Sequence, residues 1–245
     1  MSNTSLIHSQ LTTSTLRILL DAGEVVLESQ RALHKGGLNL VGECLKGQGD
    51  FYELSHYPAD DVFDSDSKSQ YYFHTHRGLD GEYGHFHTFL RAAGMPPAIT
   101  PIRNTGTEPW PEGDDALSHL ICIAMNRDGL PIGLFTTNRW VTGETWYKAE
   151  DVIAMLDAFV VDHAFPNLAV NQWISSMFRL FKYEIAELLR ERDDAIRNWK
   201  AEHPGVDVFE DRGLEVTSYK TINVDQQIGT IKACLEKQDA GVKSL

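Results

Sequence analysis

The stretches QYYFHTH at residues 70–76 and GHFHTFLR at residues 84–91 decide the fold. Both are aromatic-rich and alternate between two kinds of side chain, which is typical of β-strands. Between them, residues 77–83 (RGLDGEY) carry the glycines and the aspartate of a hairpin loop. We therefore expect the two stretches to pair as one antiparallel hairpin.

A second hairpin is predicted farther along the chain. Residues 119–126 and 131–138 are again strand-like, and Arg127-Asp128-Gly129 lies between them as a turn. The sequence thus predicts a small antiparallel sheet of two hairpins, at about residues 70–91 and 118–138.

Helical periodicity flanks the two hairpins. Leu16, Leu20 and Leu27 recur with a 3.6-residue period in the first helical segment. The predicted helices cover residues 13–34, 149–161, 167–201 and 225–237, and a strand-like segment covers residues 214–221. A helix over 167–201 would run about 50 Å, longer than a small core needs, so its far end can project, cover a partner or serve a homodimer. The order of helices, hairpins and helices predicts a single α+β domain over residues 1–245.

Three segments have the composition of loops. Residues 1–12 form a loose polar end, and residues 57–68 (YPADDVFDSDSK) predict an acidic, solvated connection. Residues 94–117 hold five of the nine prolines. A loop of that length is usually either functional, such as a lid, or disordered, and we expect it to close over the site.

The composition limits the function classes. The chain has 245 residues, with 35 Asp and Glu against 22 Lys and Arg, so the formal net charge is −13. So acidic a surface repels nucleic acids and anionic membranes, and neither is an expected partner. No apolar run reaches about 18 residues, and the first residues lack the features of a secretory signal. The three cysteines are far apart, which predicts structural thiols in a reducing cytoplasm.

Histidines concentrate on the first hairpin. The chain has ten histidines, and the window from residue 74 to residue 87 holds four of them as two HxH pairs: His74, His76, His85 and His87. Residues i and i+2 of a strand share a face, so each pair points one way. A register that pairs His76 with His85 also pairs His74 with His87 and brings four imidazoles to one patch.

The acidic and histidine neighbours of this patch extend the candidate site. Glu82 lies in the connecting loop, near the rim of the patch, and His119 can join if the second hairpin lies alongside. Imidazole nitrogen suits divalent Fe, Zn and Cu, and three or four histidines with a carboxylate can hold one such ion or Mn. Glu82 is the candidate catalytic residue, as a metal ligand, an anchor for an imidazole N–H, or a general base for bound water.

Two other interpretations stay open for the histidines. A hydrogen-bonded cluster without a metal would use the same rings for acid–base chemistry or ligand binding. A register slip of one residue would send the two pairs to opposite faces and leave a structural set only. The role of segment 138–146 (NRWVTGETW) is also open: Thr142 or Thr145 can cap the helix predicted from Ala149, or the segment can form a pocket wall.

Two resemblances add to this reading. The stretch YYFHTHRGLDGEYGHFHTFLR, with the later LFTTNRWVTGETW, resembles an uncharacterised bacterial family of unknown function and implies no activity. Locally, HxH followed by Glu and His on strands resembles the cupin superfamily, which implies a metal held by His74, His76, Glu82 and His85 or His87 inside a small barrel. The glycine expected ahead of the HxH and a second cupin motif are missing.

We therefore expect a transition-metal protein that acts as a metal-dependent oxygenase or hydrolase of a small molecule. The competing hypothesis is a non-catalytic protein that stores a metal, binds a ligand or senses pH through the same cluster.

Overall fold

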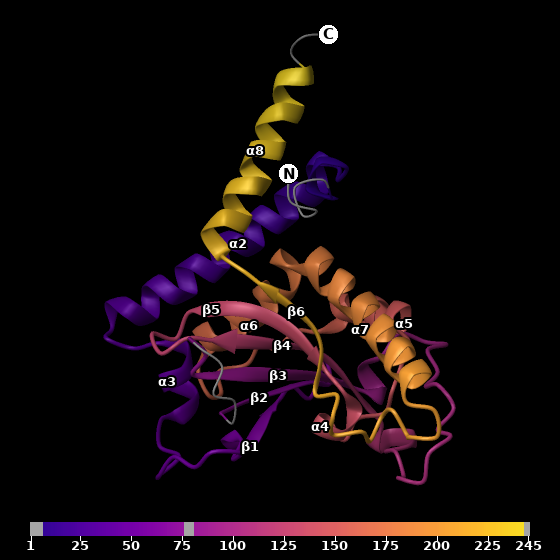
Figure 1. Ribbon diagram of the computed structural model, residues 1–245. Helices are drawn as coiled ribbons and strands as arrows, with labels where there is room; N and C mark the ends of the chain where they lie inside the picture. The colour runs from indigo at the N-terminus through magenta and orange to yellow at the C-terminus, as the bar shows by residue number, and fades with distance from the viewer. Residues whose placement is uncertain (1–6, 76–80, 243–245) are drawn as a thin grey trace.

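The computed structural model describes residues 7–75 and 81–242, and it shows one six-stranded antiparallel sheet with helices (Figure 1). The strands lie in chain order, β1-β2-β3-β4-β5-β6, so each strand pairs with its neighbours in sequence. Their bounds are β1 Tyr57–Phe63, β2 Ser69–His74, β3 Gly84–Arg91, β4 Leu117–Met125, β5 Pro131–Thr137 and β6 Val216–Thr221. The predicted α+β class is confirmed, and both predicted hairpins are present as β2–β3 and β4–β5. The open sheet also limits the cupin resemblance to its local motif, because a cupin would close a barrel.

One edge of the sheet differs from the sequence prediction. The acidic segment 57–68, predicted as a loop, contains β1, which pairs with β2. Tyr57 and Val62 of this strand are buried, so two apolar side chains anchor an otherwise acidic strand. The turn follows at Asp64, whose carboxylate accepts the backbone N–H groups of Asp66 and Ser67. Edge strands tolerate such charges because one side faces solvent.

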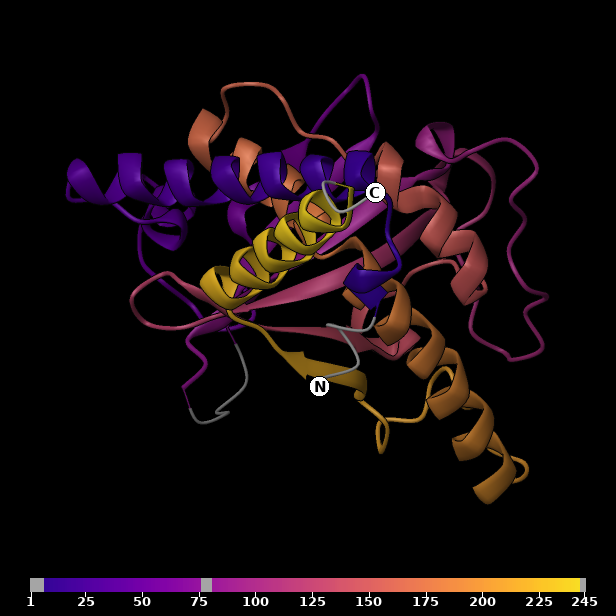
Figure 2. The same ribbon diagram turned by 90° about the horizontal axis from the view of Figure 1, so that it is seen from above.

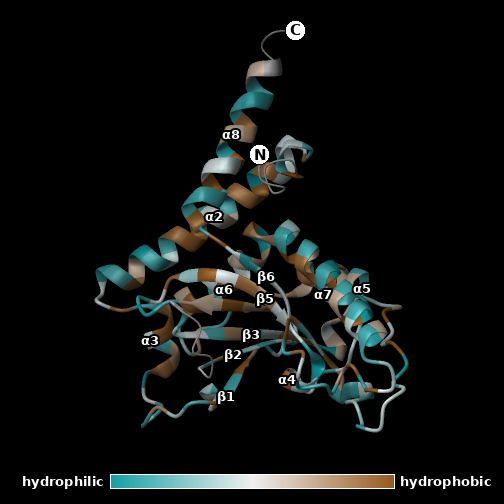
Figure 3. Cartoon of the chain, viewed as in Figure 1, coloured by the Kyte–Doolittle hydropathy of each residue, from teal (hydrophilic) through white to brown (hydrophobic). Residues whose placement is uncertain are grey.

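The longer helices form layers on one face of the sheet. The helix bounds are α2 Thr13–Lys35, α3 Leu40–Leu45, α4 Arg139–Thr142, α5 Ala149–Met155, α6 Leu168–Leu180, α7 Lys182–Glu202 and α8 Val224–Val242. α6 and α7 lie against the sheet, α2 packs on α6, and α8 crosses α2 and extends outward (Figures 1 and 2). Hydrophilic and hydrophobic residues alternate along these helices, as amphipathic helices require (Figure 3).

The helical segment predicted over residues 167–201 is divided into α6 and α7. Phe181 lies between them with φ −108° and ψ 20°, outside the helical region, and its side chain is 1 % exposed. The break lets each half pack separately, with α6 against α2 and α7 against β6 and α5. A straight helix of about 50 Å would leave much of its apolar stripe uncovered.

The two faces of the sheet carry different residues. On the helix-covered face, Phe86 packs against Trp173 of α6, with ring centroids 5.7 Å apart, and against Phe73. The intervening residues of the same strands, among them His74, His85 and His87, point to the opposite face, because side chains alternate. The main hydrophobic core therefore lies between sheet and helices, and the histidines lie outside it.

Two loop segments are more ordered than their composition suggests. Of the polar end at residues 1–12, the structure describes residues 7–12, and His8 is fully buried there. The Pro-rich segment 94–117 borders a cavity of about 560 Å³, together with Thr145 and Tyr147. Of the first-hairpin histidines that the structure describes, none lines this cavity. In the part of the chain that the structure describes, no helix combines the length and the apolar character needed to cross a membrane.

Candidate metal centre

The observed register of the first hairpin brings three of the four predicted histidines together. His74 pairs with His85, and His87 pairs with Tyr72. The sequence analysis paired His74 with His87, so the observed register differs by two residues. A shift of two keeps every side chain on its face, whereas a shift of one would have separated the pairs. His76 lies outside the residues that the structure describes.

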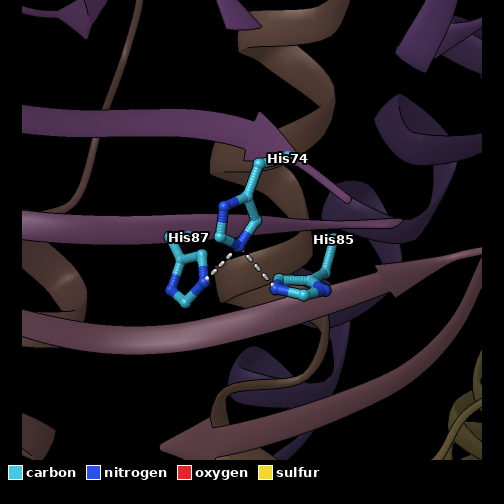
Figure 4. A group of neighbouring side chains, drawn as sticks. All are labelled: His74, His85 and His87. Carbon is cyan, nitrogen blue, oxygen red and sulfur yellow. Dashed lines mark hydrogen bonds between the residues drawn. The ribbon is translucent and has the colours of Figure 1, made fainter. Parts of the chain in front are cut away.

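The three rings converge on one point (Figure 4). Nε2 of His74 lies 2.9 Å from Nε2 of His85 and 3.0 Å from Nε2 of His87. The exposed fractions of the three residues are 7 %, 1 % and 0 %. We call these three residues the histidine centre. Their donor atoms lie within 4.8 Å of one another and make one of two groups that could hold a metal among the described residues.

Glu82 fixes the orientation of one ring of the histidine centre. Its Oε1 lies 2.6 Å from Nδ1 of His85, and both side chains are almost fully buried. The carboxylate accepts the Nδ1–H, so Nε2 of a neutral His85 carries a lone pair aimed at the other rings. A carboxylate that holds the N–H of a metal-binding histidine is a common arrangement in metalloproteins. Of the three roles predicted for Glu82, this geometry matches the anchor.

The spacing of the nitrogens fits a metal ion. Two nitrogens at 2.0–2.1 Å from one ion lie about 2.9 Å apart when the bonds meet at about 90°. The two Nε2–Nε2 distances of the histidine centre match this value. Nε2 of His74 carries either one proton or one lone pair. Without an ion it could therefore make at best one shared, bent hydrogen bond to the two neighbouring ring nitrogens. A cation accepts all three lone pairs.

A second group of donors adjoins the histidine centre. Nδ1 of His87 lies 3.2 Å from Nε2 of His119 and 3.2 Å from Sγ of Cys122, and those two atoms are 3.3 Å apart. All three residues are at most 2 % exposed. We call His87, His119 and Cys122 the Cys122 group, and it is the second of the two potential metal-binding groups.

The Cys122 group depends on an irregularity in β4. Thr88 pairs with Ile121, but Phe89 pairs with His119, so Leu120 is an extra residue in β4. In a regular strand, residues three apart point to opposite faces, and this bulge brings His119 and Cys122 to the same face. The sequence analysis admitted His119 to the site but treated Cys122 as a structural thiol, because no sequence pattern reveals a bulge.

Electrostatics around His119 favour the neutral ring. Burial, with a smaller contribution from the nearby Arg192 cation, lowers the pKa of His119 to about 3. Its backbone N–H donates to Oε2 of Glu144 at 2.7 Å. Burial also raises the pKa of Glu144 to about 7, although Arg192 opposes the rise. Neutral imidazole is the form that binds metals, so burial keeps His119 in that form.

The segment 138–146 forms part of a cavity wall, but it does not cap the helix at Ala149, because α5 begins without a side-chain cap hydrogen bond from this segment. Asn138 caps α4, and its side chain accepts the N–H of Arg139. Thr145 lines the cavity beside the Pro-rich segment, one residue after Glu144. The segment therefore connects the backbone of His119 to the wall of that cavity.

Comparisons with known proteins give a family but no activity. Neither the curated proteins nor the solved structures gave a match to the chain. Residues 20–222 match a family described as a domain of unknown function, DUF6969. This range includes both hairpins, the histidine centre and the Cys122 group, and it confirms the resemblance to an uncharacterised family. The chain belongs to the DUF6969 family.

Proposed function

We propose that this protein binds a divalent transition metal at the histidine centre, with His74, His85 and His87 as ligands and Glu82 as the anchor of His85. The observation that carries the proposal is that Nε2 of His74 lies 2.9–3.0 Å from the Nε2 atoms of His85 and His87, all three buried, with His85 oriented by a carboxylate. Imidazole ligands favour Fe, Zn, Cu or Ni over Mg and Ca.

The same geometry supports a metal-dependent enzyme as the finer proposal. Three protein ligands leave at least one position of a four-coordinate ion for a substrate or water. A metal in such a site supplies Lewis acidity, or redox chemistry if it is iron or copper. Glu82 would hold the Nδ1 proton of His85 and keep the ring in its binding orientation. A non-catalytic carrier or sensor is the alternative, and burial of the three rings favours it.

The direct test is a metal titration of untagged protein stripped with a chelator. Zn²⁺, Fe²⁺, Mn²⁺ and Cu²⁺ are added in turn, and we expect at least one tightly bound ion per chain for one of them. Because the ion binds only the folded state, the free energy of unfolding should rise by about 2.7 kcal/mol at a free concentration of 100 times Kd. Less than one ion per chain and no stabilisation would support a metal-free histidine network instead.

Exchange of metal-bound water with bulk water distinguishes an enzyme from a carrier or sensor. With Cu²⁺ bound, an open coordination position accelerates the relaxation of bulk water protons, whereas a site filled by protein ligands does not. We expect acceleration for the enzyme proposal. A centre that binds its ion tightly without affecting water would indicate storage or sensing.

A further inference from the structure

We propose that the Cys122 group is a second metal site, which takes zinc or copper and shares the ring of His87 with the histidine centre. The inference rests on the proposed function, because His87 is one of the ligands assigned there. It adds a thiolate ligand and a second ion, and the experiment below separates its failure from that of the first site.

The ring of His87 faces both groups at once. Its Nε2 lies 3.0 Å from Nε2 of His74, and its Nδ1 lies 3.2 Å from both Nε2 of His119 and Sγ of Cys122. The two nitrogens of one imidazole therefore point into two different donor groups. When both nitrogens bind an ion the ring loses its last proton, and the negative charge is offset by the two cations.

The donor spacing of the Cys122 group also fits one ion. Two nitrogens at 2.0–2.1 Å and a thiolate at about 2.3 Å from a shared ion meet at bond angles of about 95–105° when their separations match those observed. The observed separations are 3.2, 3.2 and 3.3 Å. The ligands come from two adjacent strands, and His87 and Cys122 are direct partners in the β3–β4 register. A strand pair holds such ligands in place without help from loops.

The ligand types determine which ions fit. Thiolate with two imidazoles suits zinc and copper, whereas Mg²⁺, Ca²⁺ and Mn²⁺ prefer oxygen ligands. The histidine centre offers nitrogen ligands only, whereas the Cys122 group adds a softer thiolate. The two sites therefore differ in ligand type although they share the ring of His87. Both sites are buried at the same face of the sheet, remote from the helix-side core.

Cobalt titration of the full, untagged and reduced chain tests the inference, because Co²⁺ substitutes for zinc and its bond to a thiolate gives a strong charge-transfer absorption. We expect wild-type protein to bind two Co²⁺ per chain and to show this absorption. Cys122→Ser should bind one Co²⁺ and lose the absorption. Cys44→Ser, the same change at another fully buried cysteine, should keep both ions and the absorption.

The first site is tested separately in the same series. His85→Ala removes a ligand that only the histidine centre uses, so we expect one ion with the thiolate absorption retained. Two ions in His85→Ala would contradict the histidine centre and leave the Cys122 group intact. One ion in wild-type protein with no thiolate absorption would overturn the second site alone, and no ion at all would overturn both. If Cys122→Ser does not fold, Cys122→Ala and the wild-type spectrum decide in the same way.

Discussion

Two buried histidine–glutamate pairs in this protein have different surroundings. In the sheet, His85 and Glu82 lie 2.6 Å apart and are 1 % and 3 % exposed. In the helical layers, His8 and Glu184 lie 3.5 Å apart and are 0 % and 2 % exposed. By residue type and burial the pairs are almost equivalent, so neither property explains why only the first belongs to a candidate metal centre.

The neighbours of each pair make the difference. His85 meets Nε2 of His74, which in turn meets His87, so nitrogen lone pairs converge. Glu184 instead accepts an N–H of Gln227 at 2.9 Å, and the same amide donates to a backbone carbonyl. Burial raises the pKa of Glu184 and lowers that of His8, which favours an uncharged pair within the core. A buried histidine–carboxylate pair is thus a candidate metal centre only where further ligands face it.

The largest expected effect comes from removing the histidine of each pair. His85→Ala should weaken binding at the histidine centre by more than about 100-fold, because one of three ligands is lost. His8→Ala should leave the metal affinity unchanged. Isothermal titration of both variants with the ion that binds wild-type protein measures this, after circular dichroism confirms folding. Equal losses in the two variants would mean that the pairs do not differ as described.

A smaller effect is expected from the carboxylates. Glu82→Gln removes the charge that holds the Nδ1–H of His85 and should reduce metal affinity about 10–100-fold, the range for residues that support a metal ligand. Glu184→Gln is the matched control and should not change the affinity. If Glu82→Gln binds metal like wild-type protein, the carboxylate does not act through the ring.

The smallest effect concerns pH and the core pair. Because the pKa of Glu184 is raised in the folded state, the fold prefers its protonated form. That stability is present below the ordinary glutamate pKa and is lost as the pH rises through the raised value. In Glu184→Gln, the free energy of unfolding should therefore fall less between pH 4 and pH 8 than in wild-type protein. Urea denaturation at several pH values measures the difference, and Glu24→Gln, a change at an exposed glutamate, should follow wild-type protein.

Much of the fold follows from strand alternation in the two hairpins. The alternation of Phe73 with His74 and of Phe86 with His87 assigned one face to the core and one to the histidines, and the structure confirms both. The exact pairing was not predictable, because registers that differ by two residues give the same faces. The error in register did not affect the predicted patch, because His74 pairs with His85 instead of His87 and all three side chains stay on the same face.

Other features depend on tertiary context. β1 was not predicted because the acidic residues of its segment indicate a solvated loop, although two apolar side chains are buried. The division at Phe181 was not predicted because the apolar stripe continues through this residue. Cys122 could not be grouped with His119 in advance, since residues three apart separate in a regular strand. His8 was predicted to lie in a loose end, and only the packed helices show that it is buried.

The extra residue in β4 has a consequence for evolution within the family. Leu120 lengthens one strand by a single position, and that length, rather than the identity of Leu120, places His119 beside Cys122. A relative could keep both side chains and still separate them if it lacked one residue at this point. Gaps in an alignment of this strand would therefore distinguish members with the thiolate site from members without it more reliably than the histidines and cysteines themselves.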